Sequence, residues 1–183
     1  MTKVRTLFLS TVLALAVISA PVPAEVADSG ANGFAVKFTL NISAPPAAVY
    51  GKLVRNVGDW WNSEHTFSGN AHNLRIEEKP QGCFCETLPN NGGMRHMEVV
   101  YVAPGKGLIM TGAMGPLNNM AATGNMVFQF EASEGGTKLS VSYAVHGYMK
   151  AGMNTVAPMV DKVVGEQLTR LKDYIEKGNP AAK

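Results

Sequence analysis

The sequence predicts an α+β domain in which a curved antiparallel sheet of about seven strands wraps around a long C-terminal helix. Three observations predict it: an alternating strand near the start, regularly spaced turns through the middle, and an amphipathic helix at the end. Two short helices are expected after the first strand. The C-terminal helix alone is large enough to cover the apolar face of such a sheet, so we expect it to pack there.

The first elements follow from local patterns. Residues 34–42 alternate apolar and polar side chains, which is typical of a half-buried strand. Ser43 is a candidate N-cap for the next helix, and Pro45 and Pro46 suit a first helical turn. Apolar residues then recur at helical spacing as far as Val57, before the run Asp59-Trp60-Trp61. We therefore predict one helix followed by a shorter one.

From residue 72 to residue 148, short strand-like runs alternate with Gly, Pro and Asn turn signals. This spacing predicts antiparallel hairpins joined in a meander. The clearest pair, residues 120–130 and 138–145, has one apolar and one polar face on each strand. Residues from Asn154 or Thr155 to Lys177 then carry a wide apolar stripe at helical spacing, and Gly178-Asn179-Pro180 ends that helix.

The N-terminal segment has the features of an export signal. Lys3 and Arg5 precede an apolar run over residues 6–20, and Val22-Pro23-Ala24 offers small residues at the two positions that signal peptidase reads. The run is short for a membrane span. We expect a signal peptide at 1–24 cleaved after Ala24, with an uncleaved anchor as the alternative. A linker at 25–33, the domain at 34–178 and a tail at 179–183 complete the chain, which is predicted to be periplasmic or secreted.

Composition restricts the classes of function. The 183 residues are 46% hydrophobic and 16% charged, which suits one domain with a core and argues against disorder. Without Lys3 and Arg5, basic and acidic residues are equal in number, so neither nucleic acid nor strong membrane association is expected. The sequence has no phosphate-binding glycine loop, and no cofactor is predicted.

Several motifs resemble a bacterial subfamily of the SRPBCC superfamily, the START and birch-pollen-allergen-like proteins related to polyketide cyclases and dehydrases. The run Trp60-Trp61-Asn62-Ser63-Glu64-His65-Thr66-Phe67-Ser68-Gly69 is similar to its WW-x-x-EHTFSG stretch. Residues 82–86, 96–102, 104–106 and 112–117 are similar to its later motifs, and the resemblance covers residues 34–176. It implies a helix-grip fold with a cavity between sheet and long helix that often holds lipophilic molecules.

A hydrophobic ligand in that cavity is the predicted function. The inward-facing positions are rich in methionine, whose flexible thioether suits irregular apolar ligands, although ordinary core packing is the common alternative. Adjacent tryptophans point in different directions, so we expect only one of them to line the cavity. The candidate ligand-binding residues are Trp61, Phe67, Cys83, Cys85, Met110, Met126, Phe128, Tyr143, Met159 and Val163.

The pair Cys83 and Cys85 allows three interpretations. Two residues apart on a strand, their Cα atoms would lie about 6.5–7 Å apart, at the edge of disulfide geometry unless the strand bulges. They could be buried unreactive thiols, a disulfide, or metal ligands together with His72 or His96. Cys-x-Cys alone is a weak metal signal, and no metal is assigned.

Catalytic signals are weaker. The sequence lacks a G-x-S-x-G nucleophile motif, and its histidines are scattered. Glu86 and Glu98 share strand faces with apolar residues, so either is a candidate general acid or base if buried, although a strand glutamate is more often exposed. We therefore expect an exported binding protein rather than an enzyme. The alternatives are a cyclase- or dehydrase-type enzyme using one of these glutamates with a histidine, and a periplasmic metal or redox protein centred on the cysteines.

Overall fold

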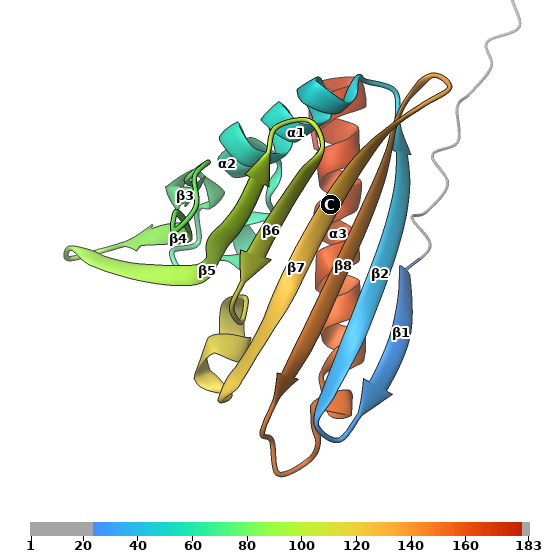
Figure 1. Cartoon of the computed structure of the whole chain (residues 1–183). Coiled ribbons are helices and arrows are strands. Elements are labelled where there is room, and N and C mark those ends of the chain that lie inside the picture. Colours follow the sequence, from blue (N-terminus) through green and yellow to red (C-terminus); the bar gives the residue numbers. More distant parts are fainter. Residues whose placement is uncertain (1–23, 181–183) are drawn as a thin grey trace, which may run out of the picture.

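The computed structural model describes residues 24–180 (Figure 1). An eight-stranded antiparallel sheet curves, without closing, around the long C-terminal helix, which confirms the predicted fold class. The strand order is β1-β2-β8-β7-β6-β5-β4-β3, so β2 pairs with the last strand in the sequence, and β1 lies outside β2 at the edge of the sheet. Within this part of the chain, no helix combines the length and the apolar character needed to cross a membrane.

The strands are β1 (Ala24–Gly30), β2 (Gly33–Ile42), β3 (Leu74–Ile76), β4 (Cys83–Leu88), β5 (Gly92–Ala103), β6 (Gly107–Thr111), β7 (Ala122–Ser133) and β8 (Gly136–Gly147). The helices are α1 (Pro46–Arg55), α2 (Val57–Trp60) and α3 (Ala157–Lys177). Short 3₁₀ turns are η1 (Ser63–His65), η2 (Ala71–Asn73), η3 (Gly115–Asn119) and η4 (Met153–Thr155).

The eighth strand is β1, and it corrects the prediction of a linker at residues 25–33. It pairs with β2 from Ala24↔Phe38 to Gly30↔Gly33. Its sequence has little apolar alternation, because an edge strand is held by main-chain hydrogen bonds and does not need to bury one face. Apart from Ala24, the predicted signal peptide lies outside the described residues.

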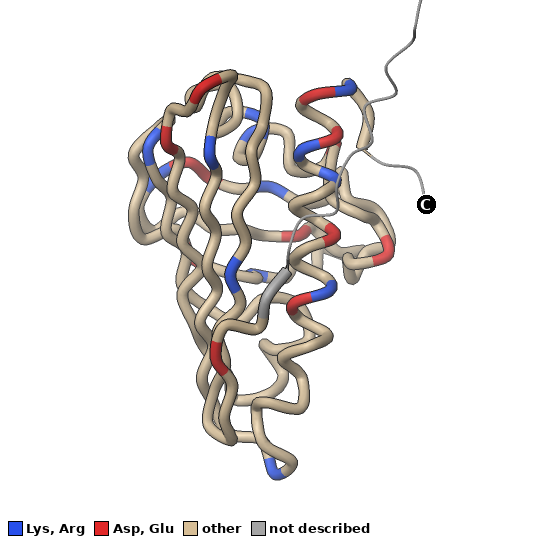
Figure 2. The backbone as a smooth tube through the Cα atoms, turned by 90° about the vertical axis from the view of Figure 1, so that its right-hand side faces the viewer, with Lys and Arg blue, Asp and Glu red and all other residues tan. Residues whose placement is uncertain are grey.

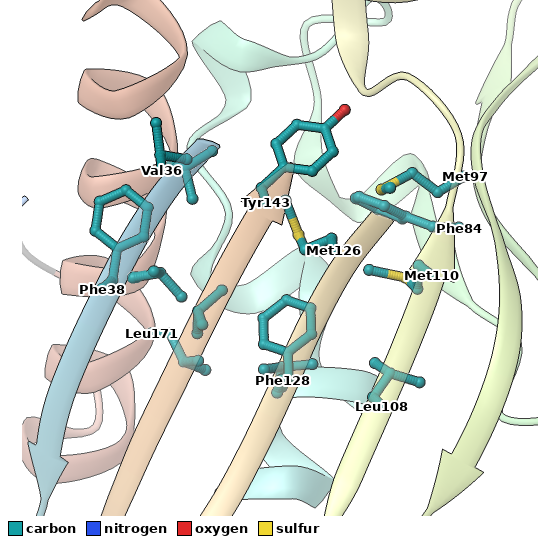
Figure 3. Close-up of a cluster of buried hydrophobic side chains, with 14 of the residues drawn as sticks. Val36, Phe38, Phe84, Met97, Leu108, Met110, Met126, Phe128, Tyr143 and Leu171 are labelled. Carbon is teal, nitrogen blue, oxygen red and sulfur yellow. The ribbon is translucent and has the colours of Figure 1, made fainter. Parts of the chain in front are cut away.

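The core fills the space between the concave face of the sheet and α3. Strand β2 buries every second residue, including Val36, Phe38 and Leu40, as its alternation predicts. Helix α3 buries a stripe that includes Leu168 and Leu171. Figure 3 shows Leu171 facing the aromatic and methionine side chains of the sheet. Burial of this apolar surface, at about 25 cal/mol per Å², is the main force that holds the helix against the sheet.

The ends of the helices refine two expectations. Helix α3 begins at Ala157, after η4, and ends at Lys177, where Gly178 adopts a left-handed conformation with φ of 78°. Ser43 is not the cap of α1: Pro45 occupies that position, and no side chain caps the helix. Instead the Ser43 N–H donates to Oε1 of Glu176 over 2.8 Å, a contact that joins the β2–α1 connection to the end of α3.

Charged residues of both signs are distributed over the backbone. Figure 2 shows Lys and Arg interspersed with Asp and Glu in that view of the described chain. Several are neighbours in ion pairs, such as Arg55 with Glu78 at 2.9 Å and Lys177 with Asp173 at 2.6 Å. This distribution agrees with the balanced charge of residues 25–183.

Candidate functional site

A pocket of about 570 Å³ lies beside the N-terminal half of α3. Three segments surround it: the chain after α2, the turn η3, and one face of α3, while strand β8 contributes Tyr143. The lining residues are Trp61, Glu64, His65, Thr66, Phe67, Met114, Gly115, Pro116, Leu117, Tyr143, Met159, Val160, Lys162, Val163, Val164 and Glu166. Most of them are apolar, and the polar groups come from residues 64–66, from α3 and from the hydroxyl of Tyr143 on β8.

Five of the ten predicted ligand-binding residues line this pocket: Trp61, Phe67, Tyr143, Met159 and Val163. The other five do not. Met110, Met126 and Phe128 are buried on the concave face of the sheet, where neighbouring side chains fill the space around them (Figure 3). Cys83 and Cys85 lie on β4.

Sequence reasoning missed the polar part of the lining. Glu64, His65 and Thr66 lie inside the motif that carries the family resemblance, but no spacing rule connects them to a pocket. For α3 a signal existed: Met159, Val163 and Glu166 are spaced i, i+4 and i+7, which places them on one helical face. The contribution of η3 depends on tertiary packing and has no local signal.

The two adjacent tryptophans have different environments. Trp60 is buried with only 4% exposure, and its indole N–H donates to the carbonyl of Lys52 over 3.1 Å. Trp61 lines the pocket, and its indole N–H donates to the carbonyl of His65 over 3.1 Å. Both indole N–H groups therefore have protein partners, and Trp61 offers the pocket an apolar surface.

The segment of residues 61–68 is tied to α3 at one end. The N–H of Asn62 donates to Oε1 of Gln167 over 2.8 Å, and its side-chain amide donates to Glu166. The imidazole Nε2 of His65 lies 3.2 Å from Oε2 of Glu166. Burial raises the pKa of Glu166, but the hydrogen bonds from Asn62 and His65 outweigh it and hold that pKa below its ordinary value. Glu166 is therefore a carboxylate with a partner on each oxygen.

The other end of this segment is tied to the sheet by Glu86. This side chain is buried, and it accepts the N–H of Phe67 over 3.1 Å and the N–H of Ser68. Its Oε2 also lies 3.0 Å from Nε2 of His96. A glutamate on a strand is usually exposed, and exposure is the common alternative that the sequence leaves open for this residue. Glu86 is instead buried.

A β-bulge brings His96 into the interior. In the β4–β5 register Phe84 pairs with Met97 and Cys85 with Arg95, so His96 has no partner on β4. An extra residue of this kind interrupts the in–out alternation of a strand. As a result the consecutive residues His96 and Met97 are both buried. The bulge thus aims an imidazole at the carboxylate of Glu86.

The directions of the pKa shifts of Glu86 and His96 indicate which of the two side chains carries the shared proton. Burial raises the pKa of Glu86, but hydrogen bonds from Ser68, Phe67 and His96 outweigh it and hold the pKa below its ordinary value. Burial lowers the pKa of His96 by more than the nearby carboxylate raises it. The pair is therefore a carboxylate and a neutral imidazole, and since a carboxylate only accepts, Nε2 carries the hydrogen. Nδ1 is buried and has no hydrogen-bond partner.

Phe67 separates this pair from the pocket. Its ring stacks on the imidazole of His96 at a centroid distance of 5.9 Å, and it also lines the pocket. The ring of Phe84 also packs against this imidazole, with the two ring centroids 5.2 Å apart. Neither Glu86 nor His96 is among the lining residues. Glu98, the other candidate acid or base, lies in an ion pair with Arg95 at 2.9 Å and is also outside the lining.

Cys83 and Cys85 form a disulfide, the second of the three interpretations. Their Cα atoms are 5.3 Å apart, closer than a regular strand allows, and the register shifts between Phe84 and Cys85. A disulfide removes both thiolates as metal ligands. Among residues 24–180, no group of three His, Cys, Asp or Glu side chains gathers in a way that could hold a metal ion. His72, one of the possible partners, lies 3.7 Å from Asp59.

Comparison with solved structures shows the fold. An uncharacterized protein from Rhizobium leguminosarum superposes with a TM-score of 0.57 at 17% identity, over 85% of this chain and 98% of the other. A protein of unknown function from Enterococcus faecalis gives 0.56 at 15% identity, over 87% and 80% of the two chains. DynU16, from the dynemicin biosynthetic locus, gives 0.55 at 13% identity, over 80% of this chain and 48% of DynU16.

No known protein family matches the sequence, and no curated protein matches it either. Because these three structures are below 20% identical to this chain, the likeness establishes a shared architecture and carries no activity with it. The function must therefore be argued from the pocket and its surroundings.

Proposed function

We propose that this chain is an exported, SRPBCC-like protein that binds a small hydrophobic molecule in the pocket beside α3. The pocket carries the proposal: its volume of about 570 Å³ lies in the range of known small-molecule sites, and its lining is predominantly apolar. Export is supported by the N-terminal segment described above. The Cys83–Cys85 disulfide suits an oxidising compartment.

Affinity would come from apolar burial. Phe67 and Met159 line the pocket and keep 47% and 49% of their surface exposed, which is unusual for large apolar side chains. A hydrophobic ligand would cover both and gain about 25 cal/mol for each Å² of apolar surface removed from water. Leu117 and Val160 are already buried and would form the deeper wall.

The proposal is tested by filling the pocket. Val163→Phe adds an aromatic ring to the lining, whereas Val100→Phe makes the same change at an exposed position on β5 outside the pocket. Protein purified from the periplasm of its own host is weighed by native mass spectrometry and again after denaturation. We expect the wild type and Val100→Phe to carry an extra mass that denaturation releases, and Val163→Phe to lack it.

A reciprocal measurement guards against ligand lost during purification. A ligand that binds only the native state raises the melting temperature with its concentration. A panel of hydrophobic molecules should therefore contain members that raise the melting temperature of the wild type and of Val100→Phe, but not of Val163→Phe. If the wild type is isolated bare and no member of the panel raises its melting temperature, the binding function is wrong.

One observation favours a cyclase- or dehydrase-type enzyme as the second candidate: the buried pair of Glu86 and His96 behind Phe67. A neutral imidazole held by a carboxylate is a suitable general base. Catalysis would require Phe67 to move so that Nδ1 of His96 meets a molecule in the pocket.

Diethyl pyrocarbonate, which modifies accessible neutral imidazoles, tests this access. If the enzyme function holds, His96 should be modified in the wild type, and faster in Phe67→Ala. Exposed His146 serves as the internal reference. If His146 reacts fully while His96 of the wild type stays unmodified with and without ligand, the pair is structural and the enzyme candidate is rejected.

A further inference from the structure

The polar side chains that line the pocket are nearly all engaged within the protein. The hydroxyl of Thr66 donates to the carbonyl of Ser63 over 2.7 Å. The hydroxyl of Tyr143 accepts the N–H of Met114 over 2.9 Å and donates to the carbonyl of Gly112. Neither O–H group is therefore free to donate to a ligand without breaking a hydrogen bond that the fold already makes.

The same holds for the acidic side of the lining. Both oxygens of Glu166 have partners, one in the side-chain amide of Asn62 and the other in the imidazole of His65. The Nε2 atom of the His65 imidazole is engaged by the same contact. Glu64 also has an interaction within the chain. These groups form the polar connection between residues 61–66 and α3.

Lys162 is the exception. It lines the pocket, its side chain is exposed, and within residues 24–180 its ammonium group has neither a hydrogen bond nor an ion pair. Asp161, its neighbour in sequence, is outside the lining. A lysine ammonium carries three donors and no acceptor, so its natural partner is an anion. Among residues 24–180, Lys162 is therefore the one side chain of the lining that offers a ligand an ammonium group with no partner in the protein.

The geometry points to an anionic amphiphile as the ligand: an apolar body against Trp61, Phe67 and Val163, with a carboxylate or similar anion paired with Lys162. This inference rests on the proposed binding function and specifies its substrate class. The apolar body supplies the affinity, while the ion pair selects for the charge of the head group and fixes the orientation of the ligand.

Three probes with the same alkyl chain and different head groups test the charge: dodecanoate, dodecanol and dodecylamine. Binding to the wild-type protein is measured near neutral pH at fixed ionic strength and below micelle concentrations, by quenching of tryptophan fluorescence, since Trp61 lines the pocket. We expect dodecanoate to bind about fivefold more tightly than dodecanol, as a part-exposed ion pair allows. Dodecylamine should bind most weakly. Added salt should reduce the preference.

Two variants and a control locate the effect. Lys162→Met keeps an unbranched side chain but removes the charge, and should make dodecanoate and dodecanol bind equally. Lys162→Arg keeps the charge and should restore the preference. Lys150→Met makes the same substitution at an exposed lysine outside the pocket and should leave the preference unchanged.

The outcomes separate the two proposals. If dodecanol or dodecylamine binds as tightly as dodecanoate to the wild type, the pocket binds hydrophobic molecules but the anionic class is wrong. If the preference survives in Lys162→Met, the assignment to Lys162 is wrong. If none of the three probes binds, and the melting-temperature panel is also negative, the binding function itself fails.

Discussion

Nε2 of His96 lies 3.0 Å from Oε2 of Glu86, and both side chains are buried between the sheet and the pocket wall. The same carboxylate accepts the backbone N–H groups of Phe67 and Ser68. Glu86 therefore joins strands β4 and β5 to the segment that forms one side of the pocket. The shape of the pocket depends on a side chain that does not line it.

Replacing Glu86 by Gln should destabilise the fold. A glutamine presents an amide –NH₂ where the carboxylate accepts three hydrogen bonds, so at least one buried donor loses its partner. We expect a loss of about 2–3 kcal/mol in the free energy of unfolding, measured by urea denaturation. Glu131→Gln, which removes an exposed partner of Lys138, should cost less than about 0.5 kcal/mol. Equal losses in the two variants would contradict the anchoring role of Glu86.

Stability should fall on mild acidification because of His96. Its pKa in the folded protein is below the ordinary 6.5, so between the two values the unfolded chain binds more protons. The free energy of unfolding should therefore decrease as the pH falls below about 6.5. Glu86 and Glu166, whose pKa values are also lowered, add a second decrease below about pH 4.5.

The contribution of His96 can be isolated by measuring urea denaturation over this pH range. His96→Gln keeps a donor for Glu86 but does not titrate, so the decrease that begins near pH 6.5 should be smaller. His146→Gln, at an exposed position on β8, should retain the wild-type profile. A wild-type profile in His96→Gln would mean that another group titrates in this window.

The hydroxyl of Tyr143 should ionise only at a pH above the usual range for tyrosine. Burial raises the pKa of its hydroxyl to about 12, despite the opposing hydrogen bond from Met114. Because the folded state disfavours the tyrosinate, stability should fall as the pH rises above about 10. Tyr143→Phe should remove one late step from the ultraviolet titration of the tyrosines and destabilise the protein by about 1–2 kcal/mol. Tyr148→Phe, at a side chain that is 77% exposed, should leave the stability unchanged.

The disulfide should stabilise the protein only modestly. It closes a loop of three residues, for which the chain-entropy relation gives ~1.5 kcal/mol, well below the value for longer loops. Replacing both Cys83 and Cys85 by Ser should therefore lower the melting temperature by a few degrees and leave the fold intact, as circular dichroism can check. Dithiothreitol should have the same effect on the wild type and none on the double variant. Complete unfolding on reduction would contradict this role.

The elements of the fold could be predicted from local patterns where burial is periodic. Residues 34–42 alternate because one face of β2 packs on the core, and α3 repeats apolar residues at helical spacing because one face packs on the sheet. Strand β1 could not be found this way, because an edge strand is held by main-chain hydrogen bonds. Ser43 matched the chemistry of a cap, yet Pro45 holds that position.

The candidate site could be predicted only in part. Trp61, Phe67 and Val163 were placed at the pocket by family resemblance and by helical spacing. Met110 and Phe128 were inward-facing as predicted, but an inward-facing residue lines a pocket only where its neighbours leave space, and the sequence does not encode that locally. The bulge that aims His96 at Glu86 depends on the register between β4 and β5, which two distant segments set together.

The sequence by itself determined the fold class, the balance of charge in the domain and the apolar character of its concave face, because periodicity and composition are properties of each segment alone. Only the tertiary structure decided where that concave face is filled and where a pocket remains. It also decided that Glu86 is a buried carboxylate, that Cys83 and Cys85 meet, and that Lys162 is the one available cation of the lining among residues 24–180. All of these features depend on how side chains from separate helices and strands pack against one another, which no single segment of the sequence determines.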